Sequence, residues 1–202
     1  MPTVHLFFVP KGCGNKSCGN EIHYVYMKCI AKSRDVLFWW SVGGVVAVAV
    51  LGTILHFLYD WTGESGVVKP FSAIDESTWQ HMKIMYFPML IFGAVQWFFF
   101  RKEYPCFFLV KLAGVLVGLT IIPVVFYTYN GAFGKSPDWL NISIFMVADI
   151  CAFWVEYILF NKLKDCKRSW KILSLTALLV IGVLMVVFTY IPPALPLFIC
   201  PV

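Results

Sequence analysis

The chain has 202 residues, of which 60% are hydrophobic and 18% aromatic, while only 13% are charged. Soluble domains carry about a quarter of charged residues, so this chain has too little charge to cover a soluble surface. The composition therefore excludes the soluble classes and indicates a membrane protein. Its net charge of +5 is explained below by membrane topology and does not indicate nucleic-acid binding.

Long apolar runs divide the chain into candidate membrane spans. A hydrocarbon core about 30 Å thick is crossed by roughly 20 apolar residues in a helix. These runs are continuous and lack the alternation of membrane β-strands, so the sequence predicts an all-α polytopic bundle of five transmembrane helices within residues 36–191. The predicted spans are 36–59, 82–100, 104–129, 139–160 and 172–191.

Two flanking segments complete the chain. Residues 1–35 form a basic N-terminal segment, in which residues 1–26 match neither a signal peptide nor an amphipathic helix. We interpret residues 1–26 as a disordered tail or as sequence upstream of the true start. Residues 192–202 are rich in proline, which excludes a sixth helix, and their apolar content predicts that this tail packs on the outer face.

The distribution of Lys and Arg predicts the orientation. Most of these residues lie in the N-terminal segment and in the second and fourth connections, which share one side of the membrane. By the positive-inside rule the N-terminus is then cytoplasmic and the C-terminus is outside. The expected partner at the cytoplasmic face is anionic lipid, and the expected location is a bacterial cytoplasmic membrane.

The connection between the first two spans contains signals of its own. Ser72 followed by Asp75 has the spacing of a capping box, so we expect a helix from Ala73 to Phe100. That helix is longer than the hydrocarbon core, so its first turns would lie in the outer interface or line a cavity there. Pro88 is expected to kink it.

Polar side chains gather at the same predicted depth. His56 and Asp60 are four residues apart, as are Ser77 and His81, so each pair shares a helix face. Each residue taken alone could be a helix-capping acid, an interfacial histidine or part of a solvated rim. The convergence of these residues at one depth favours a site for an ion or a small polar solute. The candidate residues are His56, Asp60, Glu76, Ser77, His81 and Asp149.

The fourth span carries two acids in its apolar run. Asp149 and Glu156 are seven residues apart and share one face. Each central charge costs about 2.5–3.5 kcal/mol on insertion, so both acids must face the bundle interior. Lys111 of the third span is the expected ion-pair partner of Glu156. Asp149 has no basic partner in its layer, so we expect it to face the outer histidines and to carry a proton.

Several runs resemble one family. They are Leu55–Trp61, Phe71–Lys83 with its Glu-Ser-x-Trp-x-His-x-Lys element, Phe87–Leu90, Tyr190-Ile-Pro-Pro and Pro196-Leu-Phe. Together they resemble a family of small bacterial polytopic membrane proteins known only as a domain of unknown function, over residues from about 37 to the end. The resemblance implies a topology but no activity. Gln80 stands where that family tends to have glutamate, which weakens the inference that this chain keeps a full set of metal ligands.

Two classes of function remain open, with an accessory subunit as a third. The first is an integral membrane protein whose outward-facing polar cavity binds or transports a cation, proton or small polar solute. Five helices without an internal repeat then imply a homodimer or a partner membrane subunit. The second is a membrane-embedded metal enzyme acting on lipid-like substrates, with His56, Glu76 and His81 as ligands. No His-Glu-x-x-His signature occurs, so the non-enzyme reading is favoured, and neither catalytic residues nor a cofactor is assigned.

Overall fold

The computed structural model describes residues 19–134 and 137–200, with side chains from Arg34 onward except that of Asp138. The chain divides after Leu37 into two units. The described part of the first unit is the helical stretch 19–37, and the second unit holds the rest of α1 and the other helices. Residues 1–18, most of the predicted N-terminal tail, lie outside the described part.

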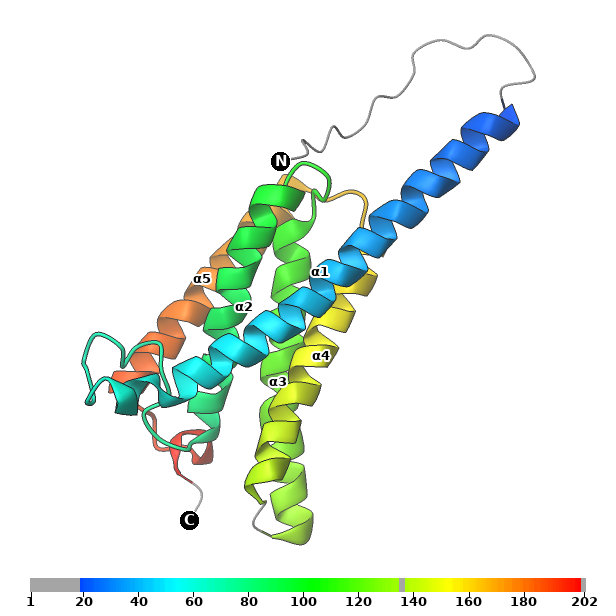
Figure 1. Ribbon diagram of the computed structural model, residues 1–202. Coiled ribbons are helices and arrows are strands. Elements are labelled where there is room, and N and C mark those ends of the chain that lie inside the picture. The colour runs from blue at the N-terminus through cyan, green and yellow to red at the C-terminus, as the bar shows by residue number, and fades with distance from the viewer. Residues whose placement is uncertain (1–18, 135–136, 201–202) are drawn as a thin grey trace. The chain divides into compact units, whose positions relative to one another are not determined.

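Within the described residues the fold is all-helical, as predicted (Figure 1). The helices are α1 (Gly19–Trp61), α2 (Thr78–Phe100), α3 (Phe107–Phe133), α4 (Asp138–Lys162) and α5 (Arg168–Tyr190), followed by one 3-10 turn, η1 (Pro196–Phe198). Each of the five α-helices contains a stretch long and apolar enough to cross a membrane. Pro88 and Pro123 lie inside α2 and α3 without ending them.

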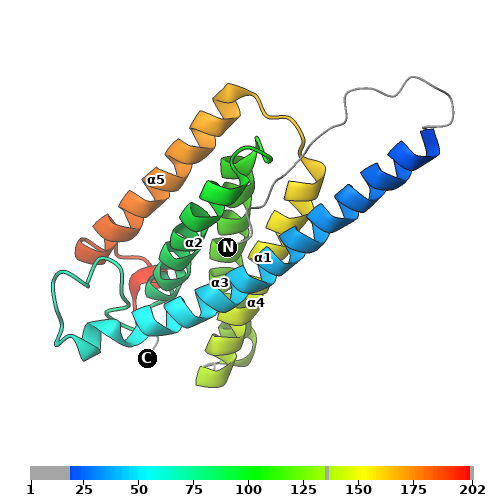
Figure 2. The same cartoon turned by 45° about the horizontal axis from the view of Figure 1, so that its top comes forward.

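Helix α3 lies at the centre of the second unit, where it packs against α2, α4 and α5. Figures 1 and 2 both show α3 and α4 side by side along their lengths. The buried core between the helices is rich in methionine and small residues, among them Met85, Met89, Ala148 and Ala152. The faces of the helices that point away from this core expose large apolar side chains such as Val183, which suits contact with lipid tails.

Two glycines let α1 approach its neighbours closely. A Cβ on Gly44 would lie 2.8 Å from Phe92 of α2 and would overlap Phe153 of α4. A Cβ on Gly52 would lie 2.9 Å from Phe145 of α4. The absence of side chains at these two positions, eight residues apart, therefore sets how close α1 comes to α2 and α4.

The capping box predicted at Ser72 is wrong. Helix α2 begins at Thr78, with Ser77 as its N-cap. The Ser72 hydroxyl instead donates to the Leu55 carbonyl and accepts from the Tyr59 N–H at 3.0 Å. Ser72 thus ties the α1–α2 connection to the end of α1, and this tertiary contact overrides the local helix signal.

The C-terminal segment packs at the same end of the bundle as the α1–α2 connection (Figure 2). The Phe198 ring lies 4.7 Å from Trp79 of α2 and 5.6 Å from Phe188 of α5, measured between ring centroids. Apolar contacts of this kind explain why a proline-rich segment is ordered here although it forms only a single 3-10 turn.

Candidate functional site

Three side chains from separate segments meet at this end of the bundle, and we call them the His–Glu cluster: His56 of α1, Glu76 of the connection and His81 of α2. The Nε2 atom of His56 lies 3.6 Å from Glu76 Oε1, and the Nε2 atom of His81 lies 3.6 Å from Glu76 Oε2. One donor atom from each residue can be chosen so that all three lie within 4.8 Å of one another. The two histidines are about three-quarters buried, whereas the Glu76 side chain is 64% exposed.

The connection is fixed by hydrogen bonds on both sides of Glu76. Upstream, the Ala73 N–H donates to the Leu55 carbonyl at 3.1 Å, which adds to the bonds of Ser72. Downstream, the Ser77 N–H donates to Asp75 Oδ1 at 2.8 Å. The backbone of Glu76 is therefore anchored while its carboxylate keeps the freedom of an exposed side chain.

A backbone contact determines the tautomer of His81. Its Nδ1 atom lies 3.0 Å from the Ser77 carbonyl oxygen. Because a carbonyl oxygen can only accept, Nδ1 must carry the proton. In the neutral ring the lone pair is then on Nε2, the atom that faces Glu76. Two acceptors facing each other are stabilised by a positive charge between them, either a proton or a cation.

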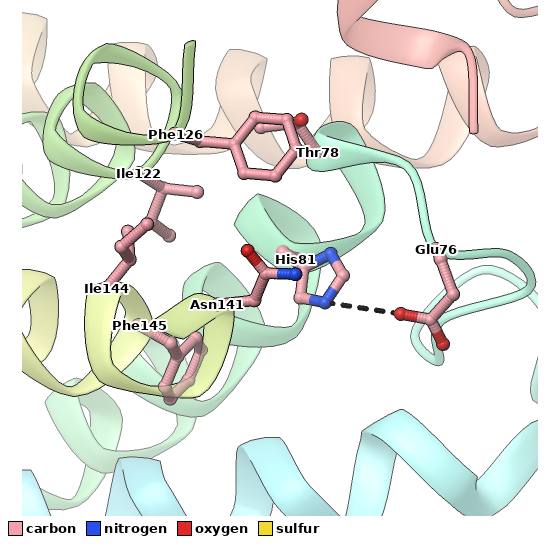
Figure 3. Close-up of a pocket in the computed structure, with 8 residues that line it drawn as sticks. All are labelled: Glu76, Thr78, His81, Ile122, Phe126, Asn141, Ile144 and Phe145. Atoms are coloured by element: carbon pink, nitrogen blue, oxygen red, sulfur yellow. Dashed lines mark ion pairs between the residues drawn. The ribbon is translucent and has the colours of Figure 1, made fainter. Parts of the chain in front are cut away.

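A small pocket opens beside the cluster (Figure 3). Its volume is about 20 Å³, which is room for roughly one water molecule. The polar lining consists of Glu76, Thr78, His81 and Asn141, and Figure 3 shows the Asn141 side chain of α4 beside the His81 ring. The apolar lining consists of Ile122, Phe126, Ile144 and Phe145.

The remaining predicted site residues have different positions. Asp60 is exposed and its charge acts on His56, so it adds negative potential to the cluster. Ser77 takes part through its backbone carbonyl. Asp149 differs from the expectation that it faces the histidines: it is fully buried, and the charged groups that act on it are Glu156 and Lys111.

The structure brings Lys111 and Glu156 together as a buried ion pair, with 2.7 Å between Nζ and Oε2. Sequence analysis did not include Gln96, whose Oε1 accepts from the same Nζ at 2.9 Å. An amide in the otherwise apolar second half of α2 was the available signal. Gly114 makes room for the pair, since a Cβ there would lie 2.5 Å from Glu156 Cγ.

Lys83 is a second residue that sequence reasoning did not select. Its side chain is fully buried, and its Nζ donates to the Lys69 carbonyl and to Thr189 Oγ1, both at 3.1 Å. Lys83 therefore joins the α1–α2 connection to the end of α5. The available sequence signals were a charged residue inside the predicted span 82–100 and the final position of the Glu-Ser-x-Trp-x-His-x-Lys element.

The fold defines the class as a multi-pass helical membrane protein, because five helices are long and apolar enough to span a bilayer. Their outer faces are apolar and the polar groups between them are buried. Within that class the chain belongs to DUF6512, a family of unknown function whose model matches residues 27–202. The expected membership of an uncharacterised membrane-protein family is thus confirmed. No curated protein and no solved structure matches the chain.

Proposed function

We propose that this membrane protein binds a divalent transition-metal cation at the His–Glu cluster. The observation that carries the proposal is the convergence of His56, Glu76 and His81, whose donor atoms lie within 4.8 Å of one another. Two imidazole nitrogens and one carboxylate oxygen suit zinc and its neighbours better than magnesium or calcium, which prefer oxygen ligands.

The distances support a tetrahedral site. Zinc–nitrogen and zinc–oxygen bonds of about 2.0–2.1 Å place neighbouring ligand atoms roughly 3.4 Å apart. The two 3.6 Å separations are close to that value but involve different carboxylate oxygens of Glu76, and the three donor atoms lie within 4.8 Å of one another, so the ligands must draw together around the ion. Because Glu76 is the exposed member, its carboxylate can make the remaining adjustment without moving a helix.

The hydrogen bond to His81 supports the same assignment. Metal-bound histidines usually donate their second ring N–H to a carbonyl or a carboxylate, which orients the ring. His81 has this arrangement, because Nδ1 donates to the Ser77 carbonyl while Nε2 faces Glu76. The pocket beside His81 leaves a fourth position for a water molecule or an exchanging solute.

The pocket favours cation binding over the metal-enzyme alternative. Three protein ligands and one open position also occur in catalytic zinc sites. The volume of about 20 Å³ beside His81 fits a water molecule, which is what the open coordination position of a bound cation would take. Under the orientation expected from Lys and Arg, the cluster faces the outside and would receive its cation there, as the entry site of a binding or transport protein.

Metal binding by the purified protein in lipid nanodiscs tests the proposal. We expect about one zinc ion per chain by mass spectrometry, and roughly 10–100-fold or greater loss of affinity in His56→Ala and His81→Ala. Glu64→Gln removes an exposed acid of the same connection and should bind as the wild type does. Cobalt(II) absorption reports the ligand geometry directly. Equal zinc affinity in the wild type and His81→Ala would contradict the proposal.

Transport is tested separately with proteoliposomes that contain a zinc-sensitive dye. Zinc-dependent dye response that is lost in His81→Ala, but kept in Glu64→Gln, would extend binding to transport. Stoichiometric binding without any dye response would limit the function to binding.

A further inference from the structure

A second polar group lies deep inside the membrane-spanning part of the bundle, apart from the His–Glu cluster. Asp149 is near the middle of α4, about 16 Å along the helix from Asp138 at 1.5 Å per residue. Its side chain has no exposure to solvent. Neither carboxyl oxygen has a hydrogen-bond partner among the described residues.

The neighbouring lysine is already engaged. Lys111 Nζ donates to Glu156 Oε2 at 2.7 Å and to Gln96 Oε1 at 2.9 Å. The same ammonium lies 5.1 Å from the centre of the Phe153 ring. With two hydrogen bonds and a cation–π contact, Lys111 is satisfied without Asp149.

The charges in this layer do not balance if all three groups are ionised. Lys111 contributes one positive charge, whereas Asp149 and Glu156 contribute two negative charges. The described parts of the neighbouring helices supply no other charge, because only Glu156 and Lys111 act on Asp149. Helix α1 has no titratable residue between Asp35 and His56. An additional ionised carboxylate with no hydrogen bonds is strongly disfavoured in this setting, because burial removes its hydration without supplying a donor.

We propose that Asp149 is a proton-binding site inside the bundle and holds its proton in the resting protein, on the face of α4 that also carries Glu156. The proton is bound to one of the two Oδ atoms and leaves to water as a hydronium ion, so the carboxylic acid becomes a carboxylate. Asp149 then acquires its negative charge at a place where Glu156 and Lys111 are the charged groups that act on it. This ammonium supplies a counter-charge for the short-lived ionised form.

The two acids of α4 thus have different roles. Glu156 is ionised, because Lys111 donates directly to it and Gly114 leaves it room. Asp149 is the neutral acid, because it receives no donor. A carboxyl that can gain and lose a proton within a membrane bundle is the element that proton relays and ion-coupled carriers use. The proposal does not depend on metal binding at the His–Glu cluster.

Infrared spectroscopy of the protein in dodecylmaltoside micelles, which contain no ester carbonyl, tests the proposal at neutral pH, because a protonated carboxyl has a C=O band separate from those of carboxylates and the amide backbone. We expect such a band in the wild type, and its loss in Asp149→Asn, where the amide imitates the shape of a neutral acid. Asp165→Asn removes an exposed acid from the α4–α5 connection and should keep the band. Size-exclusion profiles and circular dichroism establish that each variant is folded.

A measurement on the unsubstituted protein covers the case in which Asp149→Asn does not fold. Labelling every aspartate carboxyl with carbon-13 should shift the band if an aspartate carries the proton. The absence of a band in the folded wild type would overturn the proposal. It would also be overturned by a band that does not shift with labelled aspartate, because the proton would then be on Glu156 or another glutamate.

Discussion

Removing the lysine of the buried ion pair should have a larger effect on stability than removing both partners. In Lys111→Met the Glu156 carboxylate, which is 1% exposed, has no counter-charge. In the double variant Lys111→Met/Glu156→Met the acid is absent as well. The comparison therefore separates the cost of an unpaired buried charge from the net contribution of the pair.

The structure gives the expected magnitudes. Breaking a buried pair by removing one partner costs about 3–5 kcal/mol, and the 2.7 Å contact between side chains no more than 3% exposed places this pair in that class. In the double variant the main remaining defect is the Gln96 oxygen, which has lost its 2.9 Å bond to Lys111. An unsatisfied buried acceptor costs about 1–3 kcal/mol. The second substitution should therefore recover roughly 2 kcal/mol.

The free energy of unfolding can be measured by titrating SDS into dodecylmaltoside micelles and following tryptophan fluorescence. Lys102→Met makes the same chemical change at an exposed position and should alter stability by no more than about 0.5 kcal/mol. If the double variant is as unstable as Lys111→Met, the cost does not come from the unpaired Glu156, and the electrostatic reasoning is refuted.

Two further predictions concern packing and thiol chemistry. Gly44→Ala should destabilise the protein by about 1–3 kcal/mol, because the added Cβ would overlap Phe153. Gly43→Ala has open space around it and should be neutral or stabilise the protein by up to about 1 kcal/mol. The reverse ranking in the same SDS titration would contradict the placement of α1. Burial and the neighbouring thiol of Cys166 raise the pKa of Cys106 to about 11. The thiolate fraction of Cys106 is therefore small at neutral pH and rises about tenfold per pH unit below that pKa. Maleimide should modify Cys106 far more slowly than the exposed Cys200, as measured by peptide mass spectrometry. Equal rates in the folded protein would be inconsistent with burial of Cys106.

Hydropathy was sufficient to predict the five membrane spans, because a continuous apolar run of about 20 residues has few alternatives in a bilayer, but it did not predict that α1 begins as early as Gly19. The local helix signal at Ser72 failed because its hydroxyl has partners on α1, and sequence spacing does not reveal that contact. For the site, the four-residue spacing of Ser77 and His81 does bring them into contact, but Ser77 is the N-cap of α2 and contributes its backbone carbonyl. Sequence spacing could not show which charged groups act on Asp149, since that depends on how α4 is rotated against α3.

The contact between Phe198 and Trp79 connects the C-terminal segment to the start of α2. Trp79 lies in the first turn of α2, two residues before His81, so the C-terminal segment packs against the turn that carries His81. A protein or lipid that captured this segment would release the indole ring and loosen the turn that orients the His81 imidazole. Displacing the C-terminal segment would therefore change the packing of the helical turn that carries His81.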